Sequence, residues 1–442
     1  MGIVNISFSL DGFKKAVQEG VFQPDHLSFG YVDGVKFEQY QKQQEWKLSN
    51  INETFDELQQ RMSRRYFKNV MLAQNVALDY ASLQFPAYSM LITEDMSEDW
   101  LAIVDFHKKH SRDHSLHQPL TAYIAATLLG CGEGEKSLAI PVEPGNLLDY
   151  CVKAILTLKE TAYIREIAKR YGLPNNMLEY NAAAREFWKD LFYRTVVLSA
   201  LFHDIGYPWQ FIDRIGTAIR KNASILYPVE STVIRIVDQF KDRMVLLPVR
   251  HYMTEHVDEP MNESDELKNL VASALSTHGF PGAVAFLSLN DTIKKYPADQ
   301  PLSLLHEFSV EWAAMGIFMH DMAAMHKIKY PKLRVNIMED PLSAIISLAD
   351  YLEEFNRPKV QFRSKAKESR MKYYSDCSEV EISSDGNGIL TVSMKYNNEA
   401  SKAIGAAFKK DETEDYFDLG NGYVDLEAIG IKKVEFVCGL MR

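Results

Sequence analysis

The residues best suited to chemistry in this sequence stand at the end of an apolar helical pattern. An apolar run up to Phe202 is followed directly by His203 and Asp204, and then by Gly206 and Pro208, which end a helix. An imidazole and a carboxylate buried at a helix end need polar partners or a metal ion. A His-Asp pair taken alone mostly caps backbone groups, so a functional interpretation depends on what else the chain offers.

Two further apolar stretches carry the same kinds of side chain. His114 and His117 stand one helical turn apart at the start of the pattern that runs to Leu129. Downstream, the apolar run that begins at Pro341 ends at Asp350, and buried carboxylates are rare unless they are paired or bound to a metal. Three apolar helices thus each deliver His or Asp inward, and a divalent cation is the simplest group that would neutralise all of them.

This ordered set resembles the HD superfamily of metal-dependent phosphohydrolases. The family pattern is a His early in one helix, a His-Asp doublet after an apolar helix, and a distant Asp; the matching positions here are His117, His203, Asp204 and Asp350. The stretches LFHDIGYP and PLSAIISLADYLEEFNRP are similar to the family's flanking sequences. The resemblance covers the chain from about Ser111 to Pro358 and implies a mainly α fold, a helical HD-type bundle.

Further residues enter through the same resemblance. His278 and His320 resemble the histidines with which some family members bind a second metal ion, while His114 competes with His117 for the first ligand position. The implied cofactor is one or two divalent ions, and a mixed shell of His and carboxylate suits Mn, Mg, Fe, Ni or Zn. Asp204 would also orient water, His114 would serve as a general acid or phosphate contact, and Arg112 would contact phosphate oxygens.

The expected function is hydrolysis of a nucleotide or related phosphate ester by a metal-activated water. Two alternatives remain open: a catalytically silent HD-type nucleotide-binding regulatory module, and a nuclease acting on single strands, which would need a basic groove. No P-loop, Gly-rich dinucleotide turn or GxSxG motif is present, so the sequence gives no support for an NTPase of that type, a dehydrogenase or a serine hydrolase.

Composition sets the wider limits. The chain has 442 residues, 46% of them hydrophobic, and a formal net charge of −11. An acidic surface repels polyphosphate backbones, so we expect a small phosphorylated substrate and not duplex nucleic acid. The sequence shows no secretory signal and no apolar run near the roughly 20 residues of a membrane span, which predicts a cytoplasmic protein without membrane contact. A homo-oligomer is compatible with this composition.

The hydrophobic patterns divide the chain into three expected parts. Residues 1–110 are predicted to be a helical N-terminal region, and 111–360 the HD-type core, with an insertion at about 130–190 that lengthens the spacing from His117 to His203. Residues 361–442 are predicted to form a small α+β domain. Within it, 380–383 and 389–394 alternate with period two around a Gly-rich turn, which indicates a hairpin, followed by a helix at 399–410 and a strand at 433–437.

Overall fold

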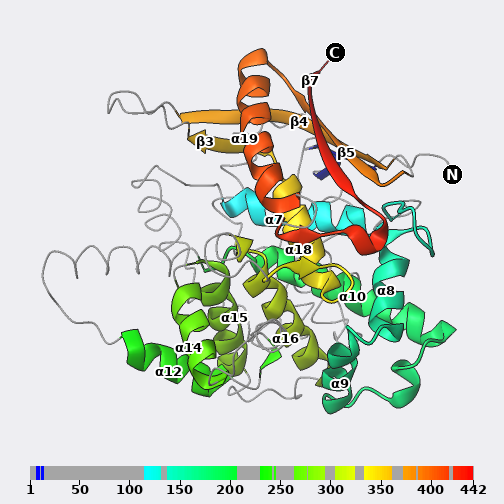
Figure 1. The fold of residues 1–442 in the computed structure, drawn as a ribbon, viewed down its shortest axis with the longest axis vertical. Coiled ribbons are helices and arrows are strands. Elements are labelled where there is room, and N and C mark those ends of the chain that lie inside the picture. The colour runs from blue at the N-terminus through cyan, green and yellow to red at the C-terminus, as the bar shows by residue number, and fades with distance from the viewer. Residues whose placement is uncertain are drawn as a thin grey trace, which may run out of the picture.

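The computed structural model describes the regions that contain the predicted motifs. The described residues are 6–9, 11–13, 114–130, 137–206, 229–240, 243–244, 263–275, 277–293, 304–323, 333–360, 372–384, 387–417 and 422–441. This part of the chain is mostly helical, with a small mixed sheet, so the expectation of a mainly α protein with a small α+β part is confirmed (Figure 1). Arg112 lies outside the described residues, and of His114 only the backbone is described.

The described helices mostly form one bundle. They are α7 (His114–Leu128), α8 (Leu147–Thr157), α9 (Ala162–Arg170), η1 (Asn175–Met177), α10 (Ala182–Phe202), α12 (Val229–Phe240), α14 (Glu263–Ala274), α15 (Gly279–Ile293), α16 (Leu304–Met319), α18 (Pro341–Leu352), α19 (Glu399–Phe417) and η3 (Glu427–Ile429). The segment expected as an insertion, 130–190, contains α8, α9, η1 and the first turns of α10.

The described strands form two sheets. They are β1 (Ile6–Ser9), β2 (Val335–Asn336), β3 (Phe355–Val360), β4 (Lys372–Ser384), β5 (Ile389–Tyr396), β6 (Val424–Asp425) and β7 (Lys433–Leu440). The larger sheet has the order β1-β4-β5-β7, with β3 paired to another part of β4, and β2 and β6 form a short parallel pair.

Side-chain caps set where the core helices begin. Asn181 accepts a hydrogen bond from the backbone of the first turn of α10, and Asn146 does the same for α8. Asp340 caps α18 through the N–H of Ser343, and Pro341 occupies the first turn, where its missing N–H has no consequence. The start of α18, and with it the placement of Asp350 near its end, is therefore fixed locally.

Buried residues on all sides of α16, of α18 and of the second half of α10 place these segments at the centre of the bundle, with α7 against α10 and α18. Fully buried aromatic rings fill the space between α10 and α16: Trp188, Phe192, Phe308 and Trp312 stack edge-on or tilted at centroid distances of 5.5–6.1 Å. These contacts fix α10 and α16 against each other, and the predicted site residues His203, Asp204 and His320 lie at the ends of these two helices.

The predicted α+β pattern near the C-terminus is confirmed. β4 and β5 pair antiparallel with Ile382 opposite Val392, as a hairpin requires, and α19 then leads to β7, which lies parallel to β5. In Figure 1, α19 covers this sheet and both lie at one end of the helical bundle, next to α7 and α18. The hairpin register places alternate residues of β5, such as Leu390 and Val392, in the core.

One short segment of the N-terminal region differs from expectation. We predicted 1–110 to be helical, but residues 6–9 form β1, which pairs antiparallel with β4. The physical reason is a period of two: Ile6 and Phe8 are buried against the sheet, while Ser7 and Ser9 point away. Apart from residues 11–13, the rest of 1–110, including the helical pattern expected at 53–83, lies outside the described residues.

Among the described residues, no single helix is long and apolar enough to cross a membrane. One bent pair, Lys268–Ala274 with Gly279–Ser288, meets the requirement by length and composition only.

Candidate metal centre

Six side chains from five parts of the fold meet inside the bundle: the first turn of α7, the end of α10, the residue before α15, the residue after α16, and the last turn of α18. They are His117, His203, Asp204, His278, His320 and Asp350. All are buried except Asp350, whose side chain is 13% exposed. Residues 233 positions apart in the chain thus share one small volume.

Glycine at the turn after the His-Asp doublet lets two of these parts approach closely. A Cβ atom on Gly206 would lie 1.8 Å from the carbonyl oxygen of His278 and 2.5 Å from the N of Gly282. No side chain fits at these distances, so the backbone after Asp204 touches the backbone that carries His278. This contact brings the end of α10 to the start of α15.

The first half of the cluster joins α7, α10 and α18. The Nε2 atoms of His117 and His203 are 3.2 Å apart. The Oδ1 of Asp350 lies 3.0 Å from the Nε2 of His117 and 3.8 Å from that of His203. Three donor atoms, two imidazole nitrogens and a carboxylate oxygen, therefore face one point, and their mutual distances suit a metal ion.

The second half joins the loop before α15 to the end of α16. The Nε2 atoms of His278 and His320 are 3.1 Å apart. The ring of His320 also lies edge-on to that of His203, with centroids 4.9 Å apart, so the two halves are in direct contact. His203, Asp204 and His320 form a second group whose donor atoms could hold an ion.

Asp204 lies between the halves. Its Oδ2 is 3.4 Å from the Nε2 of His117, whereas its Oδ1 is 3.0 Å from the Nε2 of His278 and 3.5 Å from that of His320. The Oδ1 is also 3.4 Å from the Nε2 of His203. A carboxylate that offers one oxygen to each side is suited to bridge two metal positions.

The outer nitrogen of every histidine in the cluster has an oxygen partner. The Nδ1 atoms of His203 and His320 lie 2.7 and 2.6 Å from the carbonyl oxygens of Ala200 and Ile317. A carbonyl can only accept, so these Nδ1 atoms carry hydrogen and donate it. In a neutral ring, the lone pair is then on Nε2, which points into the cluster. A ring held through its outer nitrogen with a lone pair inward is the usual state of a metal-ligating histidine.

Carboxylates hold the other two rings. The Nδ1 of His117 lies 2.7 Å from Oε2 of Glu353, and the Nδ1 of His278 lies 2.7 Å from Oδ2 of Asp321. The same Asp321 oxygen accepts the backbone N–H of His278 at 2.8 Å. Each half of the cluster thus contains one histidine backed by a carboxylate and one backed by a backbone carbonyl.

Burial and charge act in opposite directions on the histidines. Burial lowers the pKa of His203 to about 3 against the pull of Asp204 and Asp350, so its ring is neutral at pH 7. Burial would also lower the pKa of His278, but the charges of Asp321 and Asp204 and the hydrogen bonds to them outweigh it and raise that pKa to about 10. Burial likewise opposes ionisation of Asp321, yet His278 holds the pKa of this carboxyl below its usual value.

The donor set fits a divalent metal ion. Several inward-facing nitrogens 3.1–3.2 Å apart, beside the carboxylates of Asp204 and Asp350, need positive charge between them. Imidazole and carboxylate together are ligands of Mn, Fe, Zn and Ni, and the geometry does not choose among them. The buried His and Asp groups could therefore hold one ion or two.

All six residues predicted as metal ligands come together in this cluster, and His117 supplies the imidazole expected from the start of α7. His114 begins that helix, but its side chain is not described, and Arg112 lies outside the described residues. Glu353 and Asp321 were not predicted. A signal existed for both, since Glu353 stands one helical turn after Asp350 and Asp321 directly follows His320.

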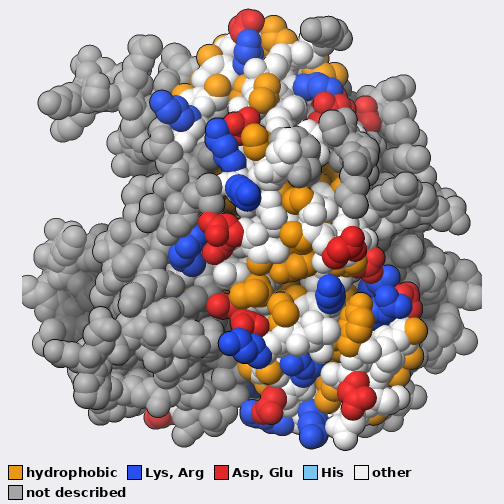
Figure 2. Space-filling view, turned by 45° about the vertical axis from the view of Figure 1, so that its right-hand side comes forward, with side chains coloured by type: hydrophobic (Ala, Val, Ile, Leu, Met, Phe, Trp, Pro, Cys, Tyr) orange, Lys and Arg blue, Asp and Glu red, His pale blue; other side chains and the backbone are white. Residues whose placement is uncertain are grey.

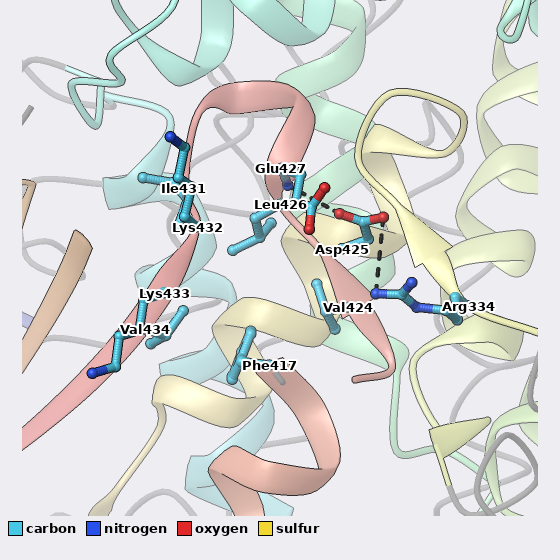
Figure 3. Close-up of a pocket in the computed structure, with 10 residues that line it drawn as sticks. All are labelled: Arg334, Phe417, Val424, Asp425, Leu426, Glu427, Ile431, Lys432, Lys433 and Val434. Atoms are coloured by element: carbon cyan, nitrogen blue, oxygen red, sulfur yellow. Dashed lines mark hydrogen bonds and ion pairs between the residues drawn. The ribbon is translucent and has the colours of Figure 1, made fainter. Parts of the chain in front are cut away.

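A separate surface pocket of about 270 Å³, part of it open solvent, lies between the end of α19, β6 and the start of β7 (Figure 3). Arg334 points into it and pairs with Asp425 at 3.8 Å, and Lys432 and Lys433 line the opposite side. None of the six clustered residues lines this pocket. On the face drawn in Figure 2, basic and acidic side chains are interspersed over the described surface, without a groove of one sign.

Comparison of the chain with protein-family models, curated proteins and solved structures finds no match.

Proposed function

We propose that this protein hydrolyses a nucleotide or a related phosphate ester at a divalent metal centre of HD type. The observation that supports the proposal most strongly is the convergence of four imidazole Nε2 atoms and two carboxylates on one buried point. The order of these ligands along the chain, a His, a His-Asp doublet, two further His and a distant Asp, is the pattern that the resemblance to the HD superfamily implies.

The reaction class follows from the chemistry of this donor set. When bound, a divalent ion would polarise a phosphoryl oxygen and lower the pKa of a water molecule to about 7. Asp204, with its two oxygens directed to opposite sides, is the carboxylate suited to accept a proton from the attacking water. The buried position of the cluster keeps bulk water away and strengthens each of these charge interactions.

Two residues before His117, His114 and Arg112, are proposed to act on the substrate itself. His114 is one turn away on the same helix, where an imidazole could donate a proton to the leaving oxygen, and Arg112 could pair with phosphate oxygens. Both roles follow from the position of these residues in the chain and from the chemistry of their side chains. Asp350, the most exposed of the ligands, is the group in the cluster nearest to solvent.

The test is release of phosphate or nucleoside from a panel of nucleoside triphosphates, monophosphates, cyclic nucleotides and short single-stranded oligonucleotides, with Mn²⁺ added. We expect turnover of at least one small nucleotide and its loss in Asp204→Asn, a variant that keeps the side-chain shape. Turnover that persists undiminished in Asp204→Asn would reject the proposal. Metal binding without turnover on any substrate would favour a regulatory nucleotide-binding module instead.

A further inference from the structure

The residues at the end of α18 contact the metal centre on one side and the C-terminal α+β part on the other. Asp350 faces His117, and Glu353 binds the outer nitrogen of the same ring. Between and beside them, Tyr351 packs against Phe417 of α19 and Phe436 of β7, with ring centroids 4.7 and 5.3 Å apart. Residues 350–354 therefore contact both the metal centre and the C-terminal α+β part.

The way in which α18 ends explains this two-sided arrangement. The helix ends at Leu352, and Glu353 has extended backbone angles, φ −70° and ψ 112°. Successive side chains of an extended backbone point to opposite sides, so Glu353 reaches His117 while Glu354 points toward α19. The Oε1 of Glu353 also accepts the N–H of Phe355 at 2.9 Å, which ties its carboxylate to the start of β3.

Lys409 of α19 holds this segment from the other side. Its Nζ lies 3.3 Å from Oε2 of Glu354, donates to the carbonyl oxygen of Tyr351 at 2.8 Å, and sits 4.1 Å from the centroid of the Tyr351 ring. The side chains of both Lys409 and Glu354 are fully buried. A buried ammonium is stable only with such partners, so their geometry is strongly specified.

We propose that Lys409 is a positioning residue for the metal centre. By fixing Tyr351 and Glu354, it sets the segment from which Asp350 and Glu353 project, and so the orientation of His117. The α+β part would then be required for metal affinity in the first half of the centre, to which the contacts of Lys409 lead directly. Its link to the second half is longer and passes through Tyr416 and Tyr423, whose hydroxyl donates to the carbonyl oxygen of Met319, next to His320. This inference rests on the proposed function, because it takes the cluster to be a metal site.

The expected loss of metal affinity depends on how directly each residue contacts a ligating histidine. Carboxylates that orient a ligating histidine change metal affinity by about 10 to 100-fold when removed. Glu353 is in that position, and Lys409 acts one step further away. We therefore expect loss of the Lys409 contact to weaken Mn²⁺ binding by about tenfold, the lower end of that range.

The experiment uses the full chain and a variant designed to fold. Lys409→Met alone would leave the Glu354 carboxylate buried without its cation, so it is combined with Glu354→Gln, which removes both charges and keeps similar volumes. Lys402→Met is the matched control, because Lys402 is on the same helix but pairs with Glu399 at the surface. Titration calorimetry measures Mn²⁺ affinity, and the visible spectrum of bound Co²⁺ reports ligand geometry.

We expect the double variant to melt cooperatively, to bind Mn²⁺ about tenfold more weakly and to show an altered Co²⁺ spectrum, with Lys402→Met unchanged. Adding Glu353→Gln should then cost little more, since both changes act on His117. If the double variant does not fold, Glu354→Gln alone, which keeps an acceptor for Lys409, should show the same spectral change with a smaller loss of affinity.

A folded double variant, or a folded Glu354→Gln, with the affinity and spectrum of the unaltered chain would overturn the inference. An effect of Glu353→Gln that adds in full would overturn it too. Absence of metal binding in the unaltered chain is a different result, because it would reject the proposed function itself.

Discussion

The two halves of the candidate metal centre are built alike but are not equal. Each half has one histidine backed by a carboxylate, one backed by a helix carbonyl, and a share of Asp204. Among the residues that the structure describes, only the first half has a further carboxylate, Asp350, directed at its imidazoles. The nearby carboxylate of the second half, Asp321, instead faces the outer nitrogen of His278.

This difference predicts that the two halves bind metal with unequal affinity. His117, His203, Asp204 and Asp350 make a set of four protein donors, which is sufficient for a tightly held ion. Among the described residues, the second half offers His278, His320 and Asp204, and it shares His203 with the first half, since His203, Asp204 and His320 form a group that could hold an ion. We infer that the first half binds its ion more tightly than the second half does.

The shared residue gives the largest expected effect. Asp204→Asn removes a charge from both halves, so we expect metal to be lost from both and phosphate release to fall by more than the roughly 100-fold seen when only a supporting residue is changed. The circular dichroism spectrum should stay helical, since the cluster is not needed to form the apolar helices around it. Activity within tenfold of the unaltered chain would show that Asp204 is not shared in this way.

Removing one ligand that belongs to a single half, first from one half and then from the other, tests directly whether their metal affinities differ. Asp350→Asn should weaken the tighter Mn²⁺ binding step, whereas His320→Ala should leave that step in place, weaken the second step and lower turnover, because it removes a ligand of the second half only. Mn²⁺ titration and phosphate release on both variants distinguish these outcomes. If the two variants lose the same binding step to the same extent, the halves are equivalent and the expected difference in metal affinity is wrong.

A smaller effect is expected from the carboxylate behind His278. Asp321→Asn keeps an oxygen that can accept from Nδ1 but removes the charge, and we expect about tenfold weaker metal binding in the second half only. The control is Asp190→Asn, since Asp190 pairs with Arg194 outside the cluster. A loss confined to the tighter binding step would contradict the geometry.

The smallest effect on metal binding is expected for a change at Asp340, the residue that caps the start of α18. Its main effect should be on the stability of the fold. Burial raises the pKa of Asp340 from 3.8 to about 6, and its Oδ2 has no hydrogen-bond partner within the described structure. Because the folded-state pKa is the higher one, the ionised carboxylate disfavours folding, and the free energy of unfolding falls as pH rises from about 4 to 6.

Asp340→Asn keeps the helix cap and removes this charge. At pH 7 it should raise the free energy of unfolding by up to about 3 kcal/mol, a gain that disappears near pH 4, with Mn²⁺ affinity unchanged. Urea unfolding at both pH values measures it. Equal stability of the variant and the unaltered chain at pH 7 would show that the Asp340 carboxyl is not perturbed.

Much of this arrangement could be predicted from the sequence because the strongest signals are local. The apolar runs that end at Phe202 and before Asp350 predict buried helices, and polar residues at the ends of such helices must meet partners inside the fold. The period of two in β4 and β5 predicted the hairpin for the same reason. All six expected ligands therefore lie together once the helices pack.

The features that the sequence did not predict depend on which way a side chain points, and residue type alone does not determine this. Glu353 and Glu354 are adjacent and identical in kind, yet one binds His117 and the other Lys409, because the chain is already extended there. Hydrophobic period cannot distinguish them. β1 escaped prediction because four residues are too short for a reliable period, and its pairing with β4 joins positions 370 to 376 residues apart, from Ser9–Glu379 to Ile6–Ile382.

The most direct test of the central claim is a Mn²⁺ titration of the full, metal-stripped chain, with Asp204→Asn measured beside it. We expect saturable binding in two steps of unequal affinity, and the loss of both steps in Asp204→Asn. An unaltered chain that binds no Mn²⁺, Zn²⁺ or Co²⁺ at micromolar concentrations, or an Asp204→Asn variant that binds them equally well, would contradict it.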